Sequence, residues 1–392
     1  MTLRESLVWP FTQPDVTQPP AEFDRLRSQD PVRKVDTDSE DPVWLLTRYE
    51  DIRSVISDPR FKPRMPVGAL DLAGAFDNSL NQDEPGHTRL RKLIAREFTP
   101  RRAAYFRPMV RNVVARRIDA MIDGDRPADF MRCVGLPVPV DVLCELLGVA
   151  DADREDIHAG ATALISIDKG DIDGVAEAGL RVYQSVSDLV AAKRREPGND
   201  LLTPLVAKRD AGPGSMTEEE LIVLGMTMLV GGYATTANAI GMGTVALIRY
   251  GLLPKLRDDP ALIPSATEEV VRYLPRSLAP IRIAKEDVEI AGHLVRAGET
   301  VVATATAANR DGDQFECPER FDITRSDSPH LGFGHGSHYC LGAHLARVEL
   351  QETFAALAER LPGLRLAVPL SELSWHTGFL GDDRLTDLLV TW

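Results

Sequence analysis

The amino-acid sequence predicts a mainly helical α+β protein, with a large helical region around one long central helix and a small β-sheet region. Three observations favour this class. Segments with helical periodicity dominate, runs typical of strands are short and few, and one long apolar segment without charges lies in the middle of the chain. No low-complexity linker or internal repeat divides the sequence, so we expect a single domain over residues 1–392.

Seven amphipathic segments predict helices along the chain. In each of them apolar residues recur every three or four positions, which places them on one face of a helix. The segments are Tyr49–Ser57, His87–Phe98, Ala103–Ile122, Val140–Leu147, Gly179–Arg195, Ser265–Leu274 and Leu341–Leu361.

The central helix is predicted at Leu221–Ile248, where 28 successive residues carry no charge. This length would suffice to cross a membrane. However, the segment is diluted with Gly and Thr, a capping box at Thr217 and Glu220 precedes it, and Arg249 follows it directly. We therefore predict a buried core helix, with a membrane span as the alternative.

Short β-branched runs predict strands near the two ends of the chain. Because these runs are few and cluster in an early and a late part of the chain, we expect the two groups to share one small sheet. The runs are Val32–Val35, Val43–Thr47, Ile281–Ala284, Val288–Ile290 and Thr300–Thr304.

The overall composition excludes several classes of protein. With 44% hydrophobic and 27% charged residues, the chain is typical of globular proteins and not of disordered or fibrous ones. Its net charge of −14 disfavours nucleic acid and anionic membranes as partners. The four cysteines form no closely spaced pair and the N-terminus lacks a secretory signal, so we expect a cytoplasmic protein.

The densest cluster of reactive side chains lies in Leu331–Glu349. Cys340 ends a glycine-rich loop and directly precedes an amphipathic helix, whose N-terminal N–H groups and dipole would stabilise a thiolate. Gly334, Gly336 and Gly342 would let backbone and a flat ligand approach the sulfur closely. The pattern suits a cysteine that is an axial ligand of iron in a planar macrocycle.

Three other interpretations of this cluster remain open. A zinc site could use His335, His338, Cys340 and His344, although structural zinc sites usually have paired ligand arms and here only one soft ligand exists. Cys340 could be a nucleophile paired with His338, although no orienting acid follows. It could also be an inert buried thiol.

The run Phe-Gly-His-Gly-Ser-His-Tyr-Cys-Leu-Gly at 333–342 resembles the Phe-Gly-x-Gly-x-His-x-Cys-x-Gly haem loop of the cytochrome P450 family. The resemblance implies the P450 fold and haem b (iron protoporphyrin IX) as cofactor. It implies Cys340 as the axial ligand of the haem iron, with Phe333, Gly334, His338 and Gly342 in the haem-binding loop.

Two further patterns resemble the same family and imply roles for charged residues. Glu269-Val-Val-Arg272 on a helix, together with Arg320 in Cys-Pro-Glu-Arg-Phe-Asp, implies a buried structural charge network; by itself the first pattern is also typical of a surface ion pair. His87-x-x-x-Arg91 lies one turn apart on one helix face and implies a haem propionate site, the alternative being two solvated residues. Arg282 and His338 occupy positions that imply propionate binding as well.

The central segment Val230–Thr236 resembles the oxygen-binding groove of the family, which places Thr235 beside dioxygen; a Thr-Thr pair could equally be inert packing. Two adjacent glycines weaken a helix locally, and a threonine hydroxyl can bond the freed carbonyls. The family usually has Asp or Glu directly before this threonine, and this sequence has Ala234. Proton delivery must then use water, another side chain or a substrate group.

The segment Arg89–Arg117 carries ten Lys or Arg residues against one acid. If the resemblance holds, this segment would attract an acidic ferredoxin; the alternative is an ordinary solvated helix face. No flavin or nucleotide domain fits in the remaining length, so electrons should come from a ferredoxin and an NAD(P)H-dependent ferredoxin reductase. We expect a monomer.

These patterns together predict a haem-thiolate monooxygenase that hydroxylates or epoxidises a bulky, mostly apolar small molecule with O2, similar to enzymes of secondary-metabolite (antibiotic) biosynthesis. One alternative is a non-insertion oxidation (desaturation, ring formation or coupling), which Ala234 motivates, and another is a non-catalytic haem-binding protein. The resemblance implies that the pocket is built from segments that vary within the family, and in this sequence they are rich in Ala, Leu, Ile, Met and Gly. They are Lys62–Asn81, Thr162–Val182, Leu229–Tyr233, Leu278–Ile281 and Gly378–Leu380.

Overall fold

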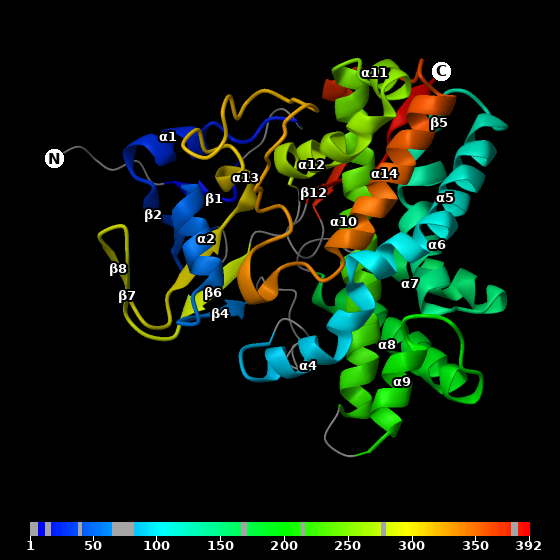
Figure 1. Ribbon diagram of the computed structural model, residues 1–392. Helices are drawn as coiled ribbons and strands as arrows, with labels where there is room; N and C mark the ends of the chain where they lie inside the picture. Colours follow the sequence, from blue (N-terminus) through cyan, green and yellow to red (C-terminus); the bar gives the residue numbers. More distant parts are fainter. Residues whose placement is uncertain are drawn as a thin grey trace. The chain divides into compact units, whose positions relative to one another are not determined.

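The structure is a computed structural model that describes residues 7–11, 17–37, 41–64, 82–165, 171–212, 216–275, 280–377 and 383–392. The chain forms two compact units, which we describe separately (Figure 1). Unit 1 comprises Met1–Val67 and Glu269–Cys340, and unit 2 comprises Gly68–Glu268 and Leu341–Trp392. Parts of three expected pocket segments, residues 65–81, 166–170 and 278–279, and the whole of a fourth, residues 378–380, lie outside the described residues.

Unit 1 is built on a six-stranded sheet in the order β1-β2-β3-β9-β6-β4. β3 pairs in parallel with β9, with Leu45 opposite Val302, which confirms that early and late segments share a sheet. The predicted strand at Val288–Ile290 is not part of it, because this strand (β7) turns back at once to pair with β8, His293–Val295. The strands of the sheet are β1 (Val8–Trp9), β2 (Val32–Thr37), β3 (Val43–Leu46), β4 (Phe61–Arg64), β6 (Ile281–Ala284) and β9 (Thr300–Ala303).

Three helices pack with this sheet in unit 1: α1 (Glu22–Gln29), α2 (Tyr49–Ser57) and α13 (Ala305–Ala308). They share one apolar core with the strands, in which Val32, Leu45 and Val301 are completely buried. The C-terminal part of α12 (Ile263–Tyr273) also belongs to this unit. The loop that ends at Cys340 therefore belongs to the same compact unit as the six-stranded sheet.

Unit 2 contains the large helical region. Its longer helices are α4 (Gly86–Ile94), α5 (Pro100–Ile122), α6 (Pro137–Leu147), α7 (Arg154–Ile165), α8 (Ile172–Arg195), α9 (Thr203–Asp210), α10 (Glu218–Arg249), α11 (Leu253–Asp258) and α14 (Ala343–Arg360). Its short strands pair as β10-β13-β5 (Arg365–Leu366, Leu389–Thr391, Ala128–Asp129) and β11-β12 (Trp375–Thr377, Asp383–Leu385). All seven predicted amphipathic segments are helical, which confirms the fold class.

The long central helix α10 runs the length of unit 2 in Figure 1 and packs against α6, α8 and α14. The capping box is present: the Thr217 hydroxyl accepts a bond from the Glu220 N–H at 3.0 Å, and the Glu220 carboxylate accepts one from the Thr217 N–H at 2.8 Å. By length and composition α10 could cross a membrane, but a core helix passes the same test, and 61% of its apolar window is buried. The helix continues unbroken through Gly231 and Gly232.

The helix α7 was not predicted from the sequence. Its residues Arg-Glu-Asp-Ile-His-Ala-Gly-Ala-Thr-Ala-Leu-Ile contain several small side chains, and in its first ten residues only Ile157 is buried. A helix that presents so few large apolar residues to the core gives a weak periodic pattern. Contacts with α6 and α8 hold it in place instead.

Candidate active site

The loop that carries Cys340 is tightly folded within unit 1. The Cys340 N–H donates to the Phe333 carbonyl at 2.8 Å, and the Gly334 N–H donates to the Leu331 carbonyl at 2.9 Å. Gly334 and Gly336 have φ angles of +73° and +72°, in the left-handed region that favours glycine. These bonds leave the Cys340 side chain exposed in unit 1.

A second constraint applies at Gly336. A Cβ atom at this position would lie 2.9 Å from Cβ of Ser57, at the end of α2. By contrast, a Cβ at Gly342 would have no atom within 4 Å. The loop therefore needs glycine at 336 for both conformation and packing, whereas Gly342 faces open space that a flat ligand could occupy.

The predicted pair Glu269–Arg272 is confirmed and completely buried. The Arg272 guanidinium donates to both carboxylate oxygens of Glu269, at 2.7 Å and 2.8 Å, and neither side chain is exposed. Arg272 also donates to the carbonyls of Asn309 and Pro318, at 2.7 Å and 2.9 Å. A buried ion pair whose remaining donors are satisfied in this way is strongly destabilised when one partner is removed.

The prediction that Arg320 supplies the second arginine is wrong. Its side chain is 66% exposed and pairs with Asp322 at 2.7 Å, whereas Arg325 donates to Glu269 at 3.3 Å and is 11% exposed. The reason is local: the Arg320 carbonyl accepts from Arg272 and the Asp322 N–H donates to Glu269, so the backbone of this segment faces the pair. The Arg320 side chain then extends to solvent.

Asn309 links this pair to the thiolate loop and was missed from the sequence. Its amide nitrogen donates to the Arg272 carbonyl at 3.1 Å, and its amide oxygen accepts from the Leu331 N–H at 2.7 Å. Asn309 is completely buried. The polar run Asn309-Arg310-Asp311 directly after an apolar stretch was the available signal, because buried polar residues need specific partners.

Arg282 on β6 is a buried cation. It is 7% exposed, and its guanidinium donates to the Ile281 carbonyl at 3.1 Å. Burial lowers the pKa of Arg282 to about 10, so it stays charged at neutral pH. No carboxylate in the described part of the chain forms a salt bridge with it. Such a guanidinium is suited to bind an anionic group of a ligand.

In unit 2, the first turn of α4 holds His87, which is 1% exposed. Its Nδ1 lies 3.2 Å from a Glu84 carboxylate oxygen, and hydrogen bonds from Thr88 and His87 lower the pKa of Glu84. Arg91 follows four residues later on the same helix and is half-buried. The predicted placement of His87 and Arg91 on one helix face is consistent with α4.

Thr235 lies on an open part of α10 within unit 2. Its hydroxyl donates to the Gly231 carbonyl at 2.6 Å, and a Cβ at Gly231 would have no atom within 4 Å. Thr227 and Thr244 make the same bond to the carbonyl four residues earlier, so the bond alone does not distinguish Thr235. What distinguishes Thr235 is its exposure, in a helix that is otherwise largely buried.

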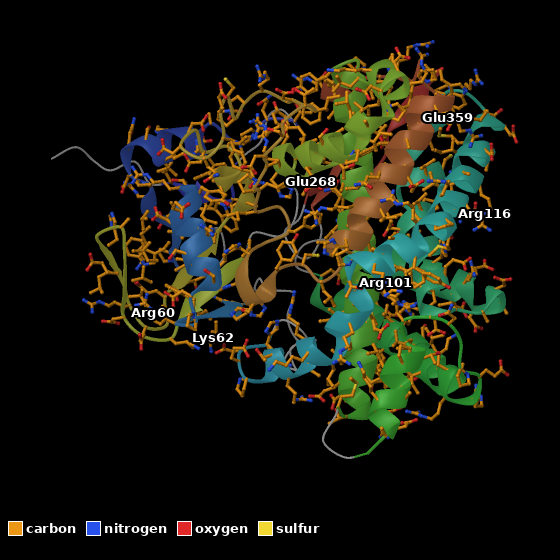
Figure 2. All side chains as sticks on the ribbon, viewed as in Figure 1. Arg60, Lys62, Arg101, Arg116, Glu268 and Glu359 are labelled. Atoms are coloured by element: carbon orange, nitrogen blue, oxygen red, sulfur yellow. The ribbon has the colours of Figure 1, made fainter. Side chains whose placement is uncertain are left out.

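Half of the basic residues in Arg89–Arg117 form ion pairs with acidic residues of unit 2. Arg107 and Arg111 bind Glu352 at 2.6 Å and 2.8 Å, and Arg117 binds Asp141 at 2.7 Å. Arg89 pairs with Glu220, and Arg102 lies 3.5 Å from Glu97. The exposed cations without a salt bridge to any described residue are Lys92, Arg96, Arg101 and Arg116, of which Figure 2 labels the last two on α5.

The zinc alternative has no support in the described part of the chain. No group of three or more His, Cys, Asp or Glu side chains there could hold a metal ion. The inert-thiol alternative conflicts with the exposure of Cys340; Cys144 shows the contrast, since it is buried and burial raises its pKa to about 12.

Comparison with known proteins decides the family. The family model described as Cytochrome P450 matches residues 260–361. The mycinamicin IV hydroxylase/epoxidase of Micromonospora griseorubida is 38% identical over 408 residues, with all of both chains covered. The chain belongs to the cytochrome P450 family. The nocardicin C N-oxygenase of Nocardia uniformis subsp. tsuyamanensis is also 38% identical over the full length of both chains.

A solved P450 structure agrees with this assignment. The crystal structure of LnmA, a cytochrome P450 hydroxylase from the leinamycin biosynthetic pathway of Streptomyces atroolivaceus, matches with a TM-score of 0.88 and 39% identity. The match covers 98% of this chain and all of that one. The protein is thus a bacterial-type P450 monooxygenase, an oxidoreductase with a haem-thiolate cofactor. The exposed Cys340, the open space at Gly342 and the buried cation Arg282 all suit this group.

Proposed function

We propose that this P450 hydroxylates or epoxidises a bulky, mostly apolar small molecule of secondary metabolism. The observation that carries the proposal is the exposed Cys340 at the end of a loop whose Gly334 and Gly336 require positive φ angles. The names of the full-length relatives, a hydroxylase/epoxidase and an N-oxygenase, support oxygen insertion. We assign the whole chain to one functional domain that acts as a cytoplasmic monomer.

The resemblance to the family names the residues that would hold haem. Cys340 would supply the axial thiolate, Phe333, Gly334 and Gly342 would lie against the macrocycle, and charged residues would bind its propionates. The propionate ligands in this proposal are His87, Arg91, Arg282 and His338. When bound, a haem-thiolate activates O2 for insertion into a C–H or C=C bond.

Three features of the chain would position the groups that take part in this chemistry. The positive φ of Gly336, the close approach of Ser57 to it and the hydrogen bond from the Leu331 N–H to Asn309 constrain the loop that carries the sulfur. The Thr235 hydroxyl donates to the Gly231 carbonyl, and it would be the side chain of α10 that orients the oxygen substrate or a water molecule by a hydrogen bond. Arg282 keeps its charge while buried and so stabilises an anion strongly.

A ferredoxin reduced by an NAD(P)H-dependent ferredoxin reductase would supply the electrons. The cations that remain for docking are Lys92, Arg96, Arg101 and Arg116. Because these side chains are exposed, they would increase the rate of encounter with an acidic partner more than the final affinity. The proposed docking surface is smaller than the whole segment Arg89–Arg117, because half of the basic residues of that segment bind acidic residues within unit 2.

Ala234 favours a second candidate, an oxidation without oxygen insertion such as desaturation, ring formation or coupling. An alanine cannot hold a proton at the position where the family usually has an acid. The mass of the product separates the two candidates, because insertion adds one oxygen and desaturation removes two hydrogens.

The first test is the absorbance spectrum of the purified, reduced protein with carbon monoxide. We expect a strongly red-shifted Soret band that is lost in Cys340→Ala, while Cys317→Ala, which changes another exposed cysteine, retains it. A spectrum unchanged in Cys340→Ala would contradict the proposal. Turnover of candidate substrates with ferredoxin partners and mass analysis of products would then define the reaction.

A further inference from the structure

The helix α4 carries two of the proposed propionate ligands, His87 and Arg91, and it is short. Its contact with the apolar core of unit 2 is made by Leu90 and Ile94, which are completely buried. A helix of nine residues is marginal by itself in water. Its orientation therefore depends on the contacts that its other residues make within unit 2.

Two pairs of residues lie on opposite sides of α4. Successive residues of an α-helix are rotated by about 100°, so residues four apart share a side. His87 and Arg91 form one such pair. Arg89 and Leu93 form another, which is rotated by about 200° from the first. The second pair is therefore on the side of the helix away from the proposed propionate ligands.

The side of α4 that holds Arg89 and Leu93 is bound to two other helices of unit 2. The Arg89 guanidinium donates to the Glu220 carboxylate at the start of α10. Near the other end of α4, Lys208 of α9 donates to the Leu93 carbonyl. Two contacts at different points along one side of a helix oppose its rotation about its own axis.

Glu220 binds both α4 and the start of its own helix. It is 7% exposed. Its Oε1 atom accepts from Arg89, and its Oε2 atom accepts from the Thr217 N–H at 2.8 Å in the capping box. The same carboxylate therefore caps the central helix and anchors α4 to it.

The two acids that precede Glu220 have different surroundings. Glu218 binds Arg194 of α8 at 2.9 Å and Arg209 of α9 at 2.7 Å. Glu219 is exposed. All three acids are favourable at this position, because the dipole of a helix attracts negative charge to its N-terminus. Of the three, Glu220 is the one that is buried and bound to α4.

We propose that Arg89 is a positioning residue for haem binding. Through Glu220 it holds α4 in one orientation, in which His87 and Arg91 would meet the haem propionates. The inference rests on the proposed function. Arg89 acts through the orientation of α4 and not by contact with the propionates. Because the ligand side of the helix is oriented before haem binds, less conformational freedom is lost on binding and the affinity is higher.

Haem transfer from the holoprotein to excess apomyoglobin tests this role without turnover. Arg89→Gln and Glu220→Gln should each speed transfer by about fivefold to tenfold, because each removes a group that orients ligand residues. A glutamine at position 220 can still accept the Thr217 N–H, so the cap of α10 is kept. The double variant should transfer haem no more than about twofold faster than either single variant, because both changes remove the same contact.

Two further variants separate positioning from general stability. Arg89→Lys keeps a positive charge that Glu220 can bind, and it should stay within about twofold of the original protein. Arg111→Gln is the matched control, because Arg111 also binds a buried glutamate of unit 2, Glu352, but lies on α5. Haem transfer in this variant should change by less than about twofold.

Hydrogen exchange of the holoprotein gives a local measurement. In Arg89→Gln, exchange should become faster in residues 86–94 and stay unchanged in α5, because the lost contact anchors α4 alone. Faster exchange throughout unit 2 would show a general structural role and overturn the proposal.

The transfer measurements can also contradict the role of Arg89. Transfer within about twofold of the original protein in Arg89→Gln would do so, as would equal acceleration in Arg111→Gln. If Arg89→Gln does not fold, Arg89→Lys and Glu220→Gln give the same comparison, and rapid haem loss from Arg89→Lys would overturn the proposal.

The carbon monoxide spectrum of the original protein keeps the two proposals apart. If its red-shifted band is absent, the proposed function fails. An intact band with an unaffected Arg89→Gln variant contradicts only the positioning role.

Discussion

The thiolate loop of unit 1 and the central helix of unit 2 differ in how much of the family pattern they keep. The loop has all six landmark residues between Phe333 and Gly342, and the structure gives a backbone or packing reason for Gly334 and Gly336. The helix keeps its glycines and Thr235 but has Ala234. Binding of the cofactor depends on local backbone geometry, whereas a proton can come from any element that reaches the site. A residue outside this helix can therefore supply the proton when the usual acid is absent.

The largest expected effect concerns the support of the loop. Arg272→Ala should lower the free energy of unfolding by about 3–5 kcal/mol, because it leaves the Glu269 charge buried with much of its pairing lost. Chemical denaturation monitored by circular dichroism measures this. Arg320→Ala should change stability by less than about 0.5 kcal/mol, because its side chain is mostly exposed. Equal losses in both variants would contradict the assignment of Arg325, and not Arg320, to the network.

A medium effect on the stability of unit 2 is expected when the pH is lowered. Bonds from His158 at 2.8 Å and Arg117 at 2.7 Å hold the pKa of Asp141 at about 2, against an ordinary value of 3.8. A carboxyl whose pKa is lowered by folding stabilises the fold fully above its unfolded pKa, and this is lost as pH falls towards the folded value. Asp141 should therefore contribute about 2 kcal/mol above about pH 4 and almost nothing near pH 2.

Unfolding measured against pH checks this contribution. Asp141→Asn should be less stable than the original protein at neutral pH, and the difference should narrow between about pH 4 and pH 2. A difference that stays constant over this range would show that ionisation of Asp141 does not contribute.

A smaller effect should follow when the missing acid is restored. Ala234→Glu alone should raise product per NADPH by a few fold, roughly 1 kcal/mol, if proton supply limits the original protein. The assay is the ratio of product and hydrogen peroxide to NADPH consumed. A lower yield, with the thiolate spectrum intact, would favour a reaction that needs no acid at position 234.

The smallest effect is expected from the exposed cations. Arg101→Glu/Arg116→Glu should slow reduction by ferredoxin several-fold at low salt, and added salt should remove the difference, because exposed charges act mainly on the encounter rate. Stopped-flow reduction at two ionic strengths tests this. Arg111→Gln is an informative comparison, because its charge is engaged with Glu352 and the change should affect stability more than reduction.

Periodicity and the loop motif were enough to predict the main helices, the shared sheet and the glycine-rich loop that ends at Cys340. They could not choose between Arg320 and Arg325, because the two side chains are five residues apart and a local turn of the backbone decides which one points inward. They also missed Asn309, whose role comes from two bonds to segments 22 and 37 residues away. The sequence pattern also does not distinguish the two buried glutamates of α14, Glu349 and Glu352. In the structure they differ, because Glu352 binds an arginine of α5 whereas Oε2 of Glu349 has no hydrogen-bond partner among the described residues.

The parallel pairing of β3 with β9 has a consequence for the synthesis of the chain. Leu45 of β3 pairs with Val302 of β9, so β3 cannot complete its pairing until most of the chain has been synthesised. Until then β3 has an exposed edge, which other chains can join. Unit 1 consequently completes late and through contacts of long sequence separation, which slow folding. A chain that stops before residue 300 would lack β9 and the cysteine loop together, and so could neither close this sheet nor bind its cofactor.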